Sequence, residues 1–123
     1  MINELTALVI DDEPFVRELL VDVLESEGYS THSAETTRHG RDLVNQNSYR
    51  LVITDLNQTP TGVDIYKLAR ERGMSACIVT GGSDVPGLME EALRVAGQNL
   101  IEKPFDIKQI QEIAKQVKGQ HQS

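Results

Sequence analysis

Short apolar runs alternate with longer amphipathic stretches along the chain. Five runs have the length and composition of strands, and the most apolar of them are typical of strands buried on both faces. They cover residues 5–10, 29–34, 50–54, 76–80 and 99–102. Apolar residues at helical spacing predict helices over residues 14–27, 35–47, 62–72, 85–96 and 107–118, the second being the weakest. Asp84 and Asp106 are the expected N-caps of the last two helices.

The regular alternation of strands and helices predicts the fold class. Parallel neighbours need crossover connections, and the five expected helices supply them. Right-handed crossovers then give a doubly wound α/β fold with helices on both faces of a parallel sheet. We expect a single domain over residues 1–123, with a core at about 5–118 and a tail at 119–123.

Composition and charge narrow the class of protein. The chain has 123 residues, 39% of them apolar and 25% charged, as in an ordinary folded domain. Its 12 Lys+Arg and 19 Asp+Glu give a net charge of −7, which disfavours direct nucleic-acid binding. No apolar run approaches the roughly 20 residues that cross a bilayer, and residues 1–5 lack the basic start of a secretory signal. A single cysteine, Cys77, excludes an internal disulfide, so we expect a cytoplasmic protein without a membrane partner.

Reactive side chains follow the predicted strands at their carboxyl ends, where open α/β sheets bind ligands. These residues are Asp11, Asp12, Asp55, Thr80 and Lys103. Two carboxylates about 4 Å apart repel by roughly 4 kcal/mol at an effective dielectric of about 20, so such a group needs a shared proton or a cation. With only oxygen ligands available, we expect Mg²⁺, with Mn²⁺ as the alternative, in a site suited to phosphoryl groups.

This ordered set closely resembles the receiver domain of two-component response regulators, over residues 5 to about 117. The resemblance implies a flavodoxin-like (βα)5 three-layer sandwich with strand order 2-1-3-4-5. It makes Asp55 the phosphoacceptor and Asp12 a direct Mg²⁺ ligand. Asp11 would bind the metal mostly through water, and the backbone carbonyl of Asn57 would complete the protein's ligands.

The resemblance also assigns roles on the other side of the site. Lys103 would hold a phosphoryl oxygen, and Pro104 would follow a cis peptide bond. Thr80 would be the hydroxyl that moves toward the phosphoryl group. The backbone amides of Leu56 and Gly81 would lie near the oxygens of that group.

The sequence departs from the family pattern in one strand position and in the loop after Asp55. Leu100 stands three residues before Lys103, where the family usually has Tyr or Phe. Leu neither stacks nor donates a hydrogen bond, so we expect the usual aromatic switch to be absent or altered. Pro60 lies five residues after Asp55 rather than four, and Gly62 lies seven after it rather than eight.

Three further residues near the strand ends have an expected role. Asn57 and Gly82 occupy positions that tune hydrolysis in the family, and Gly82 would leave the phosphoryl group open to water or a phosphatase. Glu13 is expected to cap the first helix.

The functional hypothesis is a signalling domain that assists only its own phosphorylation and dephosphorylation. A histidine kinase or a His-containing phosphotransfer protein would supply the phosphoryl group. An effector protein would bind the face formed by the fourth helix, fifth strand and fifth helix of a monomer or weak homodimer. The predicted elements use almost every residue, so we expect a stand-alone regulator. The alternatives are a receiver excised from a hybrid kinase or a DNA-binding regulator, and a pseudo-receiver that signals without phosphorylation.

Overall fold

A five-stranded parallel sheet forms the middle layer of the computed structural model, which describes residues 4–120. Its strands are β1 (Thr6–Ile10), β2 (Ser30–Ala34), β3 (Leu51–Thr54), β4 (Ser75–Thr80) and β5 (Leu100–Glu102). The spatial order is β2-β1-β3-β4-β5. The parallel pairing and this order confirm the predicted doubly wound fold.

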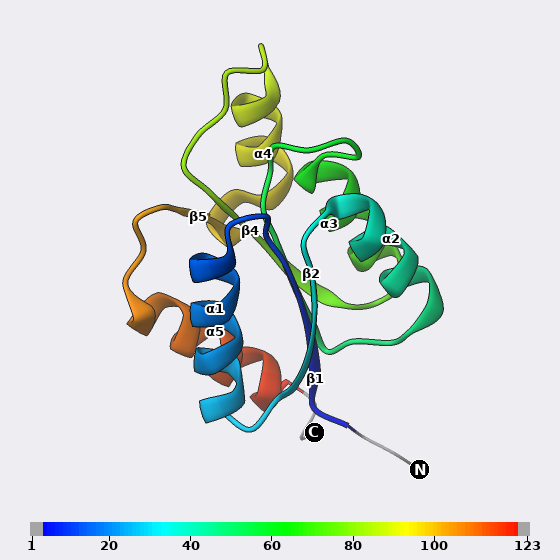
Figure 1. Cartoon of the computed structure of the whole chain (residues 1–123), viewed down its shortest axis with the longest axis vertical. Coiled ribbons are helices and arrows are strands. Elements are labelled where there is room, and N and C mark those ends of the chain that lie inside the picture. Colours follow the sequence, from blue (N-terminus) through cyan, green and yellow to red (C-terminus); the bar gives the residue numbers. More distant parts are fainter. Residues whose placement is uncertain (1–3, 121–123) are drawn as a thin grey trace.

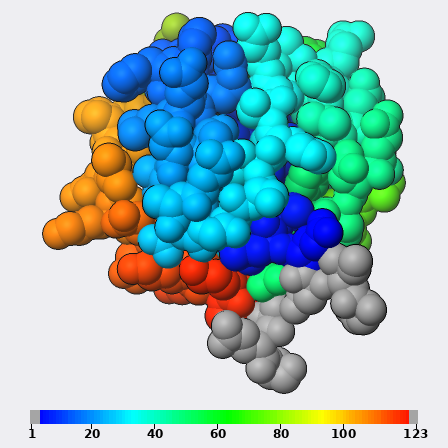
Figure 2. Space-filling model, turned by 60° about the horizontal axis from the view of Figure 1, so that its bottom comes forward, coloured from blue at the N-terminus to red at the C-terminus, as the bar shows by residue number. Residues whose placement is uncertain are grey.

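The helices cover both faces of this sheet (Figure 1). They are α1 (Pro14–Ser26), α2 (Thr37–Gln46), α3 (Gly62–Glu71), α4 (Leu88–Ala96) and α5 (Ile107–Gly119), with a short 3₁₀ helix, η1 (Gly97–Asn99). One face packs against α1 and α5, which lie side by side (Figure 2), and the other packs against α2, α3 and α4. Strands β1, β3 and β4 are therefore buried on both sides, as their continuous apolar runs predict.

The start of α4 differs from the prediction. The helix begins at Leu88 with Gly87 as its N-cap, so the expected cap at Asp84 is wrong. Gly87 has a φ of 79°, in the left-handed region that a right-handed helix cannot contain, so no helix can run through this position. The buried stripe of α4 is Leu88, Ala92 and Ala96, which leaves Leu93 54% exposed.

Helix α2 is continuous through Gly40. A β-carbon on Gly40 would overlap the side chain of Ile10, so the glycine allows the helix to lie close against β1. The Thr36 side chain accepts a hydrogen bond from the His39 amide and caps the helix.

The carboxyl end of the described chain also differs slightly from the expected tail. Helix α5 begins at its predicted N-cap Asp106 and runs through Gly119, so position 119 belongs to the helix. Positions 121–123 of the expected tail lie outside the described residues. Within residues 4–120, no helix has the length and apolar character needed to span a membrane.

Candidate functional site

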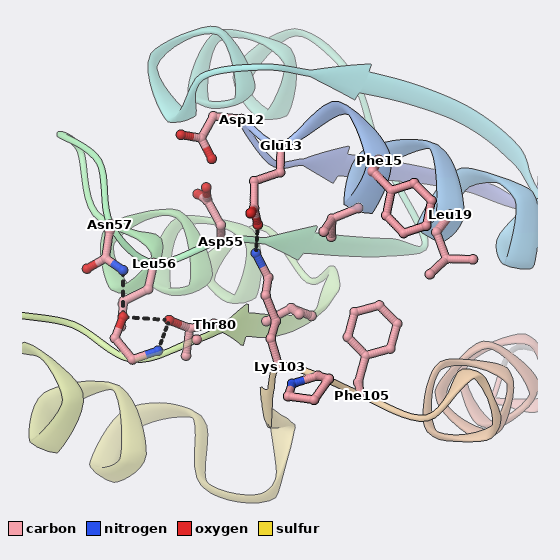
Figure 3. A pocket seen from close by; sticks show the side chains of 15 residues that line it. Asp12, Glu13, Phe15, Leu19, Asp55, Leu56, Asn57, Thr80, Lys103 and Phe105 are labelled. Atoms are coloured by element: carbon pink, nitrogen blue, oxygen red, sulfur yellow. Dashed lines mark hydrogen bonds and ion pairs between the residues drawn. The ribbon is translucent and has the colours of Figure 1, made fainter.

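A cleft of about 700 Å³ lies at the carboxyl ends of β1, β3, β4 and β5 (Figure 3). One side of it is polar, and the other is lined by apolar side chains of α1 and of the segment before α5. The polar lining includes Asp12, Asp55, Asn57, Thr80 and Lys103. The sheet topology therefore brings together side chains that are up to 91 positions apart in the sequence.

Three carboxyl groups form the centre of the polar side. One oxygen atom from each of Asp11, Asp12 and Asp55 lies within 4.8 Å of the other two. Asp11 is fully buried, Asp55 is 7% exposed and Asp12 is exposed. The carboxyl groups of Asp12 and Asp55 face one another across the cleft (Figure 3).

Burial and repulsion between like charges disfavour the ionised forms of Asp11 and Asp55. Burial, and after it the charge of Asp11, raise the pKa of Asp55 to about 6, although a hydrogen bond from Gln58 opposes them. Burial also raises the pKa of Asp11, although a lysine lies beside it. The cluster therefore favours either a proton or a cation close to these oxygens.

Lys103 supplies one positive charge to the cluster. Its Nζ donates to Asp11 Oδ2 at 3.1 Å and to Glu13 Oε1 at 2.7 Å. Burial would lower the pKa of Lys103, but the hydrogen bonds and charges of the two carboxylates outweigh it and raise the pKa. Glu13 occupies the N-cap position of α1 without a side-chain capping bond, so its expected capping role is wrong and its carboxylate binds Lys103 instead.

The donor set fits a hard divalent cation such as Mg²⁺. All the converging ligand atoms are carboxylate oxygens, and Mg²⁺ binds through one or two carboxylates while keeping waters and phosphate oxygens. Three carboxyl groups face a single ammonium, so a bound cation would offset the excess negative charge. Asp11, Asp12 and Asp55 are the residues that could hold it.

Thr80 is turned toward the loop that follows β4. Its buried hydroxyl donates to the carbonyl of Gly82 at 3.1 Å and accepts from the Gly82 amide, also at 3.1 Å. The side chain of Asn57 donates to the same carbonyl at 2.7 Å (Figure 3). The two loops on this side of the cleft are thus joined through Gly82.

Sequence reasoning missed Gln58. Its Nε2 lies 3.2 Å and 3.4 Å from the two carboxylate oxygens of Asp55. The signal that could have found it is the displaced Pro60, which indicates that the loop after Asp55 takes an unusual path.

Glycine at position 62 is explained by the backbone next to Asp55. A β-carbon on Gly62 would overlap the carbonyl oxygen of Asp55, so only glycine lets α3 begin so close to this strand end. The peptide bonds before Pro60 and Pro104 are both cis.

Two further positions that the sequence singles out are Leu100 and Gly81. Leu100 is partly buried and packs against the core cluster on the α2, α3 and α4 side. Gly81 is exposed and lines the cleft.

Comparisons with known proteins agree with this fold. The sequence profile of the response regulator receiver domain matches residues 7–115. The transcriptional regulatory protein FixJ of Azorhizobium caulinodans is 32% identical over 109 residues, which are 86% of this chain and 51% of that protein. Sporulation initiation phosphotransferase F of Bacillus subtilis is 28% identical over 118 residues, which are 94% of each.

A solved structure shows the same fold. The crystal structure of a CheY-like response regulator receiver domain protein from Methanospirillum hungatei has a TM-score of 0.80 at 21% identity, covering 96% of this chain and 97% of that one. The chain spans about half the length of the FixJ relative, and 24% of the response regulator PilR of Pseudomonas aeruginosa. The match over residues 7–115 is decisive: the chain belongs to the family of response regulator receiver domains, the phosphate-accepting modules of two-component signalling.

Proposed function

We propose that Asp55 is the residue of this receiver domain that accepts the phosphoryl group. The observation that carries the proposal is the group of three strand-end carboxyls, within 4.8 Å of one another, beside the ammonium of Lys103. Asp55 lies at the centre of the sheet edge, between the acidic pair after β1 and Thr80 at the end of β4. A pseudo-receiver without phosphorylation would not need this complete set.

The reaction is a displacement at phosphorus. An oxygen of the Asp55 carboxylate forms a bond to phosphorus, the bond from phosphorus to the histidine nitrogen of the donor breaks, and its electron pair stays on the imidazole. The charge of the transferred group is met by Lys103, which exchanges a contact with Asp11 or Glu13 for a phosphoryl oxygen. Mg²⁺ held by Asp12, Asp55, the carbonyl of Asn57 and, through water, Asp11 would supply charge neutralisation to the phosphoryl oxygens.

Signal output follows from the hydroxyl of Thr80. In the structure this hydroxyl donates a hydrogen bond to the carbonyl of Gly82. A phosphoryl group on Asp55 offers a stronger, charged acceptor, so the hydroxyl leaves Gly82 and draws the loop after β4 inward. This movement changes the face formed by α4, β5 and α5, on which we place the effector protein.

The donor is a histidine kinase or a His-containing phosphotransfer protein of the cytoplasm. It must reach Asp55 through the open cleft, past the apolar side chains at its rim. Phe15 is 78% exposed there, and Leu19 and Phe105 line the same side (Figure 3). An exposed aromatic side chain in the cleft that holds the reacting carboxylate favours a protein donor with an apolar surface around its histidine.

A titration with Mg²⁺ and beryllium fluoride, a mimic of the phosphoryl group, tests the proposal by NMR. We expect amide shifts at Asp55, Thr80 and Lys103 and along α4, and none of them in Asp55→Asn. The same shifts in wild type and Asp55→Asn would place the site elsewhere.

A further inference from the structure

Gln58 is held in place by the segment between β2 and α2. Its Oε1 accepts a hydrogen bond from the backbone amide of Thr37 at 2.9 Å, and its Nε2 donates to the carbonyl of Glu35 at 3.3 Å. The Thr37 amide can only donate, so it fixes the orientation of the Gln58 amide, with the nitrogen on the side of Asp55. The residue is half-buried and its amide is fully engaged.

The same nitrogen faces the carboxyl group of Asp55. It lies 3.2 Å from Oδ2 and 3.4 Å from Oδ1, so whichever oxygen carries a phosphoryl group, the other stays within reach of the donor. The loop brings Gln58 to this place with Pro60 two residues further on, and Thr37 supports it by donating its hydroxyl to the Pro60 carbonyl. This arrangement is a preorganised donor aimed at Asp55.

We propose that Gln58 shortens the lifetime of the phosphorylated state by donating a hydrogen bond to the Asp55 carboxylate as it leaves phosphorus. The inference rests on the proposed phosphorylation of Asp55. In hydrolysis, a water oxygen forms a bond to phosphorus, the bond from phosphorus to the Asp55 oxygen breaks, and its electron pair stays on the carboxylate. The protons of the water pass to phosphate and solvent.

The direction of the effect follows from charge. The acyl phosphate offers Gln58 only a neutral carbonyl oxygen, whereas the departing carboxylate carries a developing negative charge in a loose transition state. Hydrogen bonds to charged acceptors are about twice as strong as neutral ones, so the donor stabilises the transition state more than the phosphorylated ground state. In the forward reaction the free carboxylate is already charged, so the same donor gives no acceleration.

The test compares Gln58→Met with wild type, using acetyl phosphate and Mg²⁺ to load the protein. Met removes the donor and keeps the length of the side chain, and Gln58→Asn provides a second variant that stays polar but is too short to bridge Thr37 and Asp55. Gln98→Met is the matched control, since Gln98 is exposed in η1. Intact mass spectrometry follows loading, and then decay after the donor is removed.

We expect both Gln58 variants to lose the phosphoryl group about fivefold more slowly than wild type, with loading at least as fast. A merely structural role would move the two rates together, because a displaced loop slows loading as well as decay. Equal decay rates in wild type and both variants, or a parallel fall of loading and decay, would overturn the inference while the proposed function stands. Absence of any phosphorylated wild-type protein would overturn the proposed function and this inference with it.

Discussion

The side-chain amide of Asn57 donates a 2.7 Å hydrogen bond to the carbonyl oxygen of Gly82, and so joins the loop after Asp55 to the loop after Thr80. The Thr80 hydroxyl donates to the same carbonyl, so this one backbone oxygen accepts hydrogen bonds from both Asn57 and Thr80. Any movement of the Thr80 hydroxyl toward Asp55 leaves this carbonyl with Asn57 alone. In the proposed switch, Asn57 therefore stabilises the resting position of the loop over residues 81–87.

Asn57→Ala should loosen this loop without unfolding the domain. Loss of one neutral hydrogen bond of about 1 kcal/mol should increase amide hydrogen exchange within residues 81–87 about fivefold. Global stability in urea should stay close to that of wild type, because Asn57 is exposed. Gln98→Ala serves as the control. Unchanged exchange in this loop would show that Thr80 alone holds Gly82.

Lys103→Met should destabilise the metal-free protein at pH 7 by about 1–2 kcal/mol, since it leaves the buried Asp11 carboxylate without its ammonium. Glu13→Gln, which removes a carboxylate whose side chain is 58% exposed, should cost less than about 0.5 kcal/mol. Urea denaturation in the presence of a chelator measures both. Equal losses in the two variants would mean that Lys103 acts through its exposed partner.

Asp55→Asn should stabilise the metal-free protein at neutral pH. The folded pKa of about 6 exceeds the ordinary 3.8, so the stability that protonated Asp55 contributes is full below about pH 4 and is lost as the pH rises through 6. At pH 7 the variant should be more stable than wild type by about 2–3 kcal/mol, and the difference should shrink toward pH 4. Thermal unfolding across this range checks the slope.

The exposed Asp42 on α2 supplies the matched control for this pH dependence. Asp42→Asn should show no such gain at pH 7. A constant offset between Asp55→Asn and wild type from pH 4 to 7 would contradict the assignment of the raised pKa to burial of Asp55.

Gly62→Ala should damage the site as well as the fold. The added β-carbon would overlap the Asp55 carbonyl and the Cα of Leu56, so the backbone that positions the carboxylate must shift. We expect a loss of about 1–3 kcal/mol in unfolding free energy together with weaker Mg²⁺ binding. Gly119→Ala, where a β-carbon meets open space, should lose neither. Undiminished Mg²⁺ binding by a folded Gly62→Ala would show that the loop tolerates the shift.

The sheet and the acidic end of the cleft could be predicted because both depend on local signals. Strands buried on both faces need nearly continuous apolar runs, and β1, β3 and β4 have them. Polar residues directly after such runs must lie at one edge of a parallel sheet, so the convergence of Asp11 and Asp55 follows from topology alone.

The loop conformations and the side-chain contacts around the site could not be predicted from the sequence pattern. The start of α4 depends on the backbone conformation of Gly87, which no periodicity reports. The contacts of Gln58 with Thr37, and of Glu13 with Lys103, join residues 21 and 90 positions apart. Such contacts depend on the paths of loops, whereas the hydrophobic pattern describes only helices and strands.

Phosphorylation of Asp55 is the central claim, and intact mass spectrometry after incubation with acetyl phosphate and Mg²⁺ tests it most directly. We predict that wild type gains the mass of one phosphoryl group, that peptide mapping places it on Asp55, and that a chelator prevents it. Asp55→Asn should gain nothing, while Asp42→Asn should load like wild type. Equal loading of Asp55→Asn and wild type, or none in wild type, would contradict the account.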